Sequence, residues 1–524
     1  MTHAKPLAGY RMAGNEKAAT WAVVAVSAAV FFATALSTAD NFLKAVVVLA
    51  DLTFSGTLLA RLTRSEGWYG VVMLRSKKGL KMMDDIARAH PKAAKAIADF
   101  GVTISYGVPF AGHVFRREWK KLALHAVLSA AFYWWLQGLP AANAVLNSLT
   151  LAIGLTTGLL GLGVISLAYS TLGILTVKTA PSAVAPVVPG VTIPLWEGLI
   201  ALAIVVAVHE LSHGILARVV NLKIHSSGLL LLGFLPIGAF VEPDERAFSK
   251  LALEKKRRIL IAGTTSNFVF FLIFIALYAG ASAIAPAMLA GAKVTSIGAN
   301  STLAAALPAG TVITAVDGAK GSSGLLMSAV LSGKEVSLTT GDGRAFSEKV
   351  SQLVVNEVPA GSPSAGILAQ GDVIDGIGGV AVRTTVEART ELAKVKPGGT
   401  AFIRLTSGVE RQVVLNSEGK LGISLAQAPA FGFENEPLAD YRPFYAPVAF
   451  IMAIIGLTAF LSFALAIVNI LPVFTTDGYR IAYEELSAVL GRKGAGLAAN
   501  ATLAASIFIL ALLLINLARW FKFF

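Results

Sequence analysis

The chain of 524 residues contains no cysteine. Disulfide bonds and thiolate metal sites are therefore excluded, and any metal ion has to be held by His, Asp or Glu. Histidine is scarce as well, with seven in the whole chain, so two histidines within one short motif stand out.

Charged residues are also few, at 14% of the chain, whereas soluble globular proteins carry about 25%. Hydrophobic residues make up 55%, and the mean hydropathy of +0.69 indicates a membrane protein. We therefore expect a polytopic α-helical protein of the cell membrane, in contact with lipid, in which apolar runs form spanning helices. These runs are Ala18–Leu36, Phe42–Leu59, Leu122–Leu139, Leu149–Val177, Gly198–Ala217, Ile259–Ile284, Val448–Val468 and Leu497–Leu517.

The N-terminal region, residues 1–60, is expected to form a membrane hairpin or a signal anchor. Its first apolar run, Ala18–Leu36, is also short and rich in small residues, as a cleaved signal peptide would be. A second run returns after it, interrupted by Lys44 and Asp51, which favours the hairpin.

The charges that remain are mostly basic, with a formal net charge of +13. Residues 61–121 contain thirteen Lys and Arg against five Asp and Glu, and the loop Arg218–Arg258 contains eight against four. Basic residues that flank membrane spans stay on the cytoplasmic side. We therefore expect both segments in the cytoplasm, with 61–121 soluble in character. Nucleic-acid binding is not expected, because no stacking aromatics alternate with these charges.

Residues 288–430 differ in character, since charges of both signs appear and short strand-like runs alternate with glycine turns. An internal repeat lies here: Ser301–Gly318 matches Ser362–Gly379 without gaps at an offset of 61. The second copy, SPSAGILAQGDVIDGIGG, resembles a segment of PDZ domains. We expect two tandem PDZ-like domains, at 288–350 and 351–430, with unspecific small β domains as the alternative.

The motif His209-Glu210-Leu211-Ser212-His213 lies near the end of an apolar span. On a helix, positions i and i+4 share one face, so both imidazoles can point at one metal ion, with Glu210 close enough to accept a proton from the attacking water. A charged group inside an apolar span costs about 2.5–3.5 kcal/mol, which demands a compensating partner. A divalent cation is favoured over a metal-free pair of buried polar residues.

Two histidines leave a catalytic zinc site incomplete, because such a site takes three protein ligands and keeps one position for water. The run VNILPVFTTDGYR, at 468–480, follows a later apolar span and contains Asp477 before Gly478. Asp-Gly is also a common turn pair, so the residues alone leave a ligand and a helix-end turn as alternatives.

The combination of HExxH on one span with N-x-x-P-x-x-x-x-D-G on a later span resembles the site-2 protease family of intramembrane zinc metalloproteases. This chain has Asn469, Pro472, Asp477 and Gly478 at that spacing. The resemblance implies that Asp477 is the third Zn²⁺ ligand. One departure is Thr476, where the family often has Leu.

The likeness extends to the stretch GTTSN, at 263–267, on the middle core span, although the proline usual there is absent. PGVTIPLWEGLIALAIVVAVHELSHG and GFLPIGAFVEPDE are similar to archaeal-type members, as is a PDZ region between the second and third core spans. The resemblance covers roughly residues 60–520. It implies a three-helix metalloprotease core, with HExxH in a membrane domain at 122–287 and the third ligand in one at 431–524.

By this resemblance the protein hydrolyses peptide bonds in or near transmembrane segments of other membrane proteins, in regulated intramembrane proteolysis. Glu210 would act as general base and then as general acid. Asn267 and Asn469 would bind the substrate backbone or the oxyanion, or else hydrogen-bond neighbouring helices. A transmembrane substrate has to unwind, and residues 228–238 and Pro472 are candidate parts of a strand-like docking surface, although glycine-containing loops are also ordinary turns.

The charge pattern orients the spans. With Arg218–Arg258 in the cytoplasm, the span Ile259–Ile284 leads out, the PDZ-like domains lie outside, and Val448–Val468 returns, so Asp477 lies on the same side as the HExxH motif. Upstream, an odd number of crossings must separate residues 61–121 from the HExxH span. Two apolar runs are seen, and the longer, Leu149–Val177, is re-entrant or folds as more than one element.

Two other functions compete with proteolysis. A non-catalytic membrane scaffold could capture protein C-termini through PDZ-like domains, but such a scaffold has no need of Glu210. A transporter also places polar residues within the membrane, but the chain has no inverted repeat of spans. The oligomeric state is not fixed by the sequence.

Overall fold

The structure of the protein is a computed structural model that describes residues 14–38, 40–76, 79–138, 144–176, 182–297 and 307–521. The first thirteen residues, the start of the internal repeat at 301–306 and the expected span ends at Leu139 and Val177 lie outside these ranges. The chain divides into two compact units. The first comprises Met1–Leu172, Ser182–Leu277 and Ile451–Phe524, and the second comprises Gly173–Pro181 and Tyr278–Phe450.

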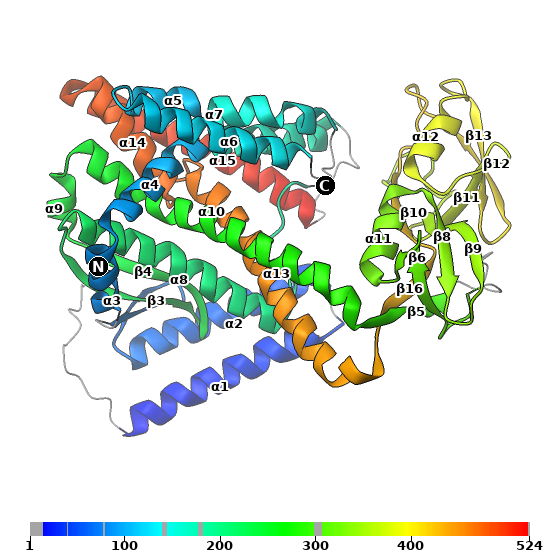
Figure 1. The fold of residues 1–524 in the computed structure, drawn as a ribbon, viewed down its shortest axis with the longest axis horizontal. Coiled ribbons are helices and arrows are strands. Elements are labelled where there is room, and N and C mark those ends of the chain that lie inside the picture. Colours follow the sequence, from blue (N-terminus) through cyan, green and yellow to red (C-terminus); the bar gives the residue numbers. More distant parts are fainter. Residues whose placement is uncertain are drawn as a thin grey trace. The chain divides into compact units, whose positions relative to one another are not determined.

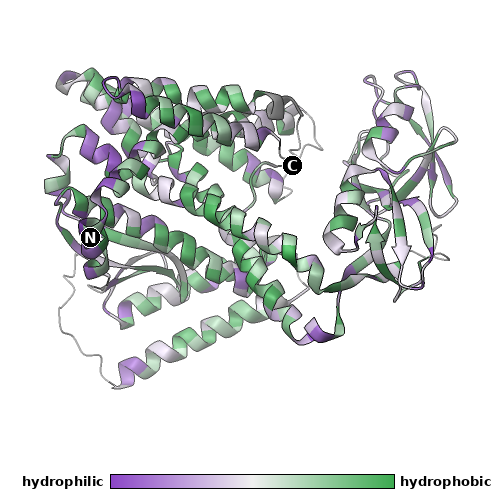
Figure 2. Cartoon of the chain, in the orientation of Figure 1, coloured by the Kyte–Doolittle hydropathy of each residue, from purple (hydrophilic) through white to green (hydrophobic). Residues whose placement is uncertain are grey.

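Seven helices in the described ranges are long and apolar enough to cross a membrane. Hydrophobic residues predominate along them (Figure 2). The seven are α1 (Gly14–Leu36), α2 (Asn41–Leu62), α7 (Ala144–Thr176), α8 (Leu195–Val219), α10 (Leu253–Ile284), α13 (Arg442–Ile470) and α15 (Ala495–Trp520). The expected polytopic helical membrane protein is thus confirmed. The run Leu122–Leu139 corresponds to α6 (Trp119–Gln137), which is not among the seven.

Helix α7 is broken in two at Gly158, where φ is 68°. The break lies against the end of α4 (Pro91–Tyr106), because a Cβ on Gly158 would lie 2.3 Å from the carbonyl group of Ser105. Glycine alone tolerates both this φ and so close an approach of two backbones. The long apolar run at 149–177 therefore folds as more than one element, which was one of its two alternatives.

A four-stranded antiparallel sheet belongs to the first unit, with the strand order β1-β2-β3-β4. Residues 66–76 supply one half of the sheet and residues 224–243 the other. The strand β4 has one strand neighbour, and its other side lies along α8 (Figure 1). The strands are β1 (Glu66–Trp68), β2 (Val71–Ser76), β3 (Ile224–Leu232) and β4 (Leu235–Pro243).

The segment 61–121 contributes buried residues to the core of the first unit, while its expected soluble character stays a prediction. On α4 the residues Ala98, Asp99 and 101–105 are buried. A Cβ on Gly101 would lie 1.7 Å from Oγ1 of Thr265 on α10, so the two helices touch at this glycine. Not all of its basic residues are exposed, since Lys121 is partly buried and pairs with buried Asp99. Its helices are α3 (Leu80–Ala89), α4 and α5 (Val108–Val114).

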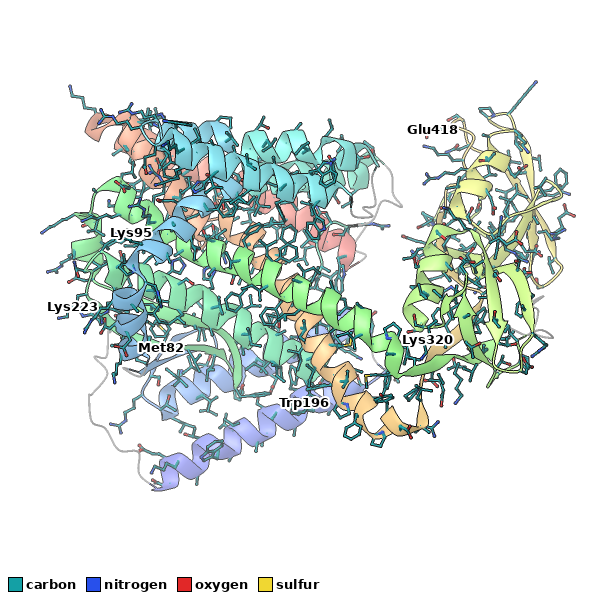
Figure 3. The ribbon with its side chains drawn as sticks, in the orientation of Figure 1. Met82, Lys95, Trp196, Lys223, Lys320 and Glu418 are labelled. Atoms are coloured by element: carbon teal, nitrogen blue, oxygen red, sulfur yellow. The ribbon has the colours of Figure 1, made fainter. Side chains whose placement is uncertain are left out.

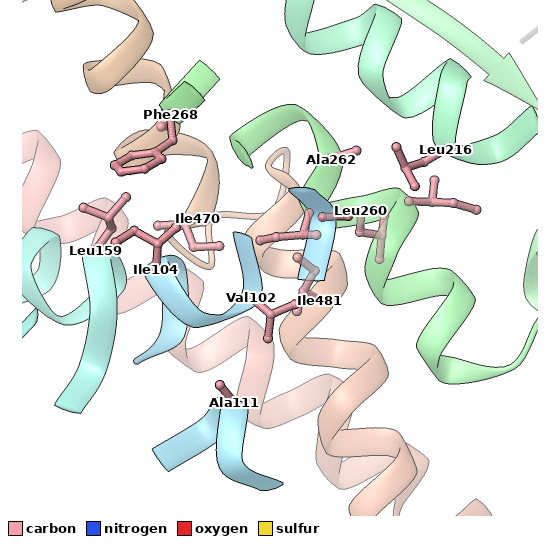
Figure 4. Close-up of a cluster of buried hydrophobic side chains, with 14 of the residues drawn as sticks. Val102, Ile104, Ala111, Leu159, Leu216, Leu260, Ala262, Phe268, Ile470 and Ile481 are labelled. Carbon is pink, nitrogen blue, oxygen red and sulfur yellow. The ribbon is translucent and has the colours of Figure 1, made fainter. Parts of the chain in front are cut away.

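The largest hydrophobic cluster joins helices that are far apart in the sequence. Ile104 of α4, Leu159 of α7, Phe268 of α10 and Ile470 of α13 all belong to it, and Figure 4 shows their side chains together. Ile481 of α14 (Asp477–Leu490) is also a member. The core thus gathers the helices that carry the predicted metal ligands. The first unit also contains the short helix α9 (Glu245–Ser249).

The second unit contains two β domains of the same topology. The first has the strand order β16-β5-β6-β8-β9, and the second has β15-β10-β11-β13-β14. Each also carries a short strand paired to the middle and one helix. The elements are β5 (Leu289–Ile297), β6 (Val312–Val316), β7 (Ala319–Lys320), α11 (Ser323–Ser332), β8 (Glu335–Thr340), β9 (Ala345–Lys349), β10 (Ser351–Glu357), β11 (Val373–Ile377), β12 (Val380–Ala381), α12 (Thr385–Leu392), β13 (Thr400–Leu405), β14 (Glu410–Val414), β15 (Ser424–Pro429) and β16 (Phe431–Pro437).

The described part of the internal repeat corresponds to equivalent strands, since β6 begins at Val312 and β11 begins 61 residues later at Val373. The two domains have separate hydrophobic cores. They are nested rather than consecutive, because β16 pairs with β5. Residues 431–437, which we assigned from the sequence to the C-terminal membrane domain, therefore complete the first β domain.

The contact between α4 and α10 leads to a first prediction. We expect Gly101→Ala to destabilise the protein by about 1–3 kcal/mol, because the new methyl group overpacks against Thr265. Gly112→Ala is the matched control, since its Cβ would meet nothing nearer than 3.7 Å and alanine favours a helix. Thermal unfolding of both variants in detergent measures the difference, and equal midpoints would contradict the described packing.

Candidate metal centre

The HExxH motif occupies the C-terminal half of α8, where His213 follows His209 by about one helical turn. Figure 3 marks the two ends of this helix by Trp196 and, just beyond the helix, Lys223. The two Nε2 atoms lie 3.1 Å apart, and His209 is buried. The i, i+4 spacing thus places both imidazoles on one face, as predicted.

Asp477 is positioned by a tight turn between α13 and α14. The hydroxyl of Thr476 donates to the carbonyl of Leu471 and accepts from the amide of Tyr479, so it caps the N-terminus of α14. A Cβ on Gly478 would lie 2.2 Å from the carbonyl oxygen of Ile470. The Asp-Gly pair is therefore both a turn and the source of a site residue, and Thr476, which departs from the family pattern, serves as the cap.

Three ligand-type atoms converge at this point. Oδ2 of Asp477 lies 3.2 Å from Nε2 of His209 and 3.2 Å from Nε2 of His213. Bonds of about 2.0–2.1 Å in a tetrahedral zinc site would place ligand atoms about 3.2–3.4 Å apart. Oδ2 is buried, and no hydrogen bond to it is found among the described residues. The geometry and this unpaired oxygen both fit a divalent cation held by the three side chains.

The ionisation of Asp477 suits a cation ligand. Burial opposes its charge, but the adjacent His213 and His209 side chains outweigh burial and hold the pKa of the carboxyl well below its usual value. The carboxylate is therefore ionised at neutral pH, and the ionised form is the one that binds a metal ion.

Glu210 lies beside the same point, held by the sheet. The backbone amide of Val241 on β4 lies near its carboxylate. The strand β4 is an edge strand of the sheet, and it contacts α8, the helix of Glu210. The general base predicted from the sequence thus lies between the imidazoles and a strand edge.

Helix α10 covers the two imidazoles from the other side. A Cβ on Gly263 would lie 2.4 Å from Nε2 of His209 and 2.5 Å from Nε2 of His213, so a residue without a side chain is needed here. The carbonyl of Ile259 lies 2.7 Å from Nδ1 of His213. Asn267, one turn after Gly263, lies 3.1 Å from Nδ1 of His209.

The two asparagines of the sequence hypothesis differ in environment. Asn267 is fully buried against His209. Asn469 lies half-buried in the last turn of α13. Its side-chain amide makes no hydrogen bond to any other described residue. A group that meets substrate has to be reachable, so the oxyanion or substrate role remains a prediction for Asn469.

Ion pairs that sequence reasoning missed join the helices of the site. Arg257 of α10 holds Glu485 of α14 through two hydrogen bonds, at 2.5 and 3.0 Å. Arg258 holds Asp99 of α4 at 2.7 and 2.8 Å, and Lys121 reaches the same carboxylate. These basic residues were counted only as signals of membrane orientation. Their partners come from distant segments, so the sequence held no local signal for the pairs.

Comparison with known families decides the classification. The model of peptidase family M50, which is the site-2 protease family, matches residues 197–513, more than half of the chain. The chain belongs to peptidase family M50. This M50 peptidase is thus a membrane metallopeptidase, and the match begins on α8, extends into α15 and includes both the HExxH motif and Asp477.

A curated relative is an uncharacterized protein of Methanocaldococcus jannaschii. The two sequences are 44% identical over 88 residues, which is 17% of this chain and 24% of the relative. The M50 peptidase thus aligns with about a quarter of that protein's length, and the relative adds no functional assignment.

The converging ligands predict metal binding. We expect the purified M50 peptidase to contain about one zinc ion per chain, and the His209→Ala/His213→Ala variant to contain almost none. His225→Ala is the control, because His225 is largely exposed and outside the cluster. Elemental analysis of detergent-solubilised protein measures the content, and wild-type levels in the double variant would contradict the assignment.

Proposed function

We propose that this M50 peptidase is a zinc endopeptidase of the site-2 type, which hydrolyses peptide bonds in or near transmembrane segments of other membrane proteins. The observation that carries the proposal is the convergence of His209, His213 and Asp477 within bonding range of one ion. Glu210 follows His209 directly on α8 and is close enough to feel the charges of all three. All four residues come from elements of the first unit, which contains the spanning helices α8 and α13.

The donor set supports zinc. Two imidazole nitrogens and one carboxylate oxygen are typical ligands of catalytic zinc, which leaves a fourth position open. A bound zinc ion would supply Lewis acidity, which favours ionisation of water and polarises the scissile carbonyl.

The protein's own groups would move the protons. Glu210 accepts a proton from the attacking water and passes it to the nitrogen of the leaving amine as the peptide bond breaks. The Val241 amide, which lies near the carboxylate, is proposed to hold its direction during this exchange. Asn469 is proposed to hydrogen-bond the substrate backbone or the oxyanion.

The outer edge of β4 is the proposed docking surface for an unwound substrate. Alternate residues of a strand turn their backbone groups to the same edge, so Ala239 presents its amide and carbonyl on the edge where the Val241 amide meets Glu210. A transmembrane segment that unwinds can satisfy its backbone by pairing there. This placement brings a scissile bond to Glu210 and extends the predicted docking region, 228–238, along β4 to Val241.

Sidedness follows from the basic residues. We propose that the metal centre lies toward the cytoplasmic face, because Arg218, Lys223 and the run 255–258 flank its helices. The chain between α10 and α13 then lies outside the cytoplasm. Its two β domains, each with a helix packed near an edge strand, are proposed to be PDZ-like and to select substrates.

The catalytic role is tested by Glu210→Gln. We expect cleavage of a membrane substrate in proteoliposomes to fall by about 10²–10⁴-fold, because an amide cannot accept the proton. Zinc content and the thermal midpoint should stay at wild-type values. Glu245→Gln, an exposed change on the short helix α9, is the control and should cleave normally. Near-wild-type cleavage by the Glu210 variant would overturn the role, and no cleavage by wild type would favour a non-catalytic scaffold.

The role of the β domains is tested by deletion. The two ends of the pair meet, since Leu289 of β5 pairs with Pro437 of β16, so a short flexible linker can replace residues 289–437. Because all metal ligands lie in the first unit, zinc binding should survive. A substrate already trimmed of its ectodomain should still be cut, and discrimination against the untrimmed form should weaken.

The comparison uses both substrates with both enzymes in proteoliposomes. A deletion variant that folds and binds zinc but cuts neither substrate would show that the β domains belong to the catalytic machinery.

A further inference from the structure

The second nitrogen of each metal-ligand imidazole faces a partner on α10. Nδ1 of His213 lies 2.7 Å from the carbonyl oxygen of Ile259, and Nδ1 of His209 lies 3.1 Å from the amide nitrogen of Asn267. Both Nε2 atoms face Asp477. One helix therefore contacts the back of both ligands while the opposite ring nitrogens converge.

The two contacts on α10 call for different tautomers, because Nδ1 of His213 faces an acceptor and Nδ1 of His209 faces a donor. A carbonyl can only accept, so His213 carries its proton on Nδ1, and Nε2 presents a lone pair to the metal position. His209 can present a lone pair at Nε2 only if its own proton is also on Nδ1. The amide nitrogen of Asn267 is a donor too, so two donors would then face each other at 3.1 Å.

The other end of the same amide resolves this mismatch. The Oδ1 atom of Asn267 is buried, and no hydrogen bond to it is found among the described residues. A half-turn of the amide exchanges oxygen for nitrogen, and Oδ1 then accepts from Nδ1–H of His209. The amide nitrogen and oxygen have nearly the same shape, so the exchange needs no movement of the helices.

The position of Asn267 is fixed by its neighbours on α10. Gly263 brings the helix backbone against both imidazoles, and Thr265 packs on Gly101 of α4. Asn267 itself is fully buried, so its side chain meets His209 rather than a substrate.

We infer that Asn267 is a positioning residue for the metal centre: its amide oxygen accepts a hydrogen bond from Nδ1 of His209 and holds that ring in the tautomer and orientation that bind the ion. Ile259 does the same for His213 through its backbone carbonyl, which no substitution of its side chain removes. Asn267 is thus the one of the two partners whose contribution can be changed by mutation. This inference rests on the proposed zinc site.

The test measures zinc affinity by competition with a chromogenic chelator, using full-length protein in detergent. Asn267→Leu has nearly the same size but no acceptor, and we expect its zinc affinity to fall about 10–100-fold. Asn267→Asp keeps an acceptor and cannot donate, so it should stay within a few-fold of wild type. Asn516→Leu is the matched control. Asn516 is an equally buried amide that hydrogen-bonds Thr171 and Ser170, neither of which is a proposed metal ligand.

The outcomes separate this inference from the proposed function. Wild-type protein that binds no zinc would overturn the metal site itself. A wild type that binds zinc, with Asn267→Leu no weaker than Asn516→Leu, would overturn the positioning role alone. If Asn267→Leu does not fold, Asn267→Asp decides. A folded Asp variant that has lost zinc affinity contradicts the claim that an acceptor at position 267 maintains the site, and retained affinity supports that claim.

Discussion

The close approach of α10 to the two imidazoles at Gly263 is the contact on which the site depends. Any side chain at this position would overlap the ring atoms of His209 and His213. Because the helix comes so near, its carbonyl at Ile259 and its amide at Asn267 can reach the far nitrogens of both rings. The absence of a side chain at Gly263 thus allows Ile259 and Asn267 of the same helix to contact the two imidazoles.

Polar groups in an apolar setting need partners, and the M50 peptidase supplies them from distant segments. The carboxylate of Asp99 is shared by Arg258 and Lys121, and Arg257 holds Glu485 in a two-bond pair. An unpaired charge in these places would be costly, and a geometrically fixed pair limits the movement of α10 relative to α4 and α14. The Arg257–Glu485 pair ties α14, whose first residue is Asp477, to α10, the helix that also contacts the two histidines.

The sequence predicted those parts of the site that are encoded locally. His209, Glu210 and His213 were found because a helix repeats every 3.6 residues, and Asp477 because its spacing from Asn469 resembles a family pattern. His209, His213 and Asp477 converge in the structure, and the roles of all four residues stay proposals.

The parts that were missed depend on tertiary contacts. The sequence around Asp99 does not indicate that its partner is Arg258, which lies 159 residues further along the chain. The sequence did not indicate the burial of α4, because its buried residues include Asp99, Thr103 and Ser105, which are polar and usually exposed. The break at Gly158 could not be predicted for a similar reason. A glycine in an apolar run is compatible with a continuous helix, and the need for a positive φ appears only once Ser105 is known to lie against it.

The nested arrangement of the β domains has a consequence for biosynthesis. The amide of Ala430 donates to the carbonyl of Val350 at 2.8 Å, so the inner domain begins and ends at one point of the outer one. A ribosome delivers β5 to β9 first, then the whole inner domain, and only then β16. At typical elongation rates of about 5–20 residues per second, β5 waits about 7–28 s for its last neighbour. The domain begun earlier is therefore finished later, and during that interval its sheet edge is open to any passing strand, including one from another chain.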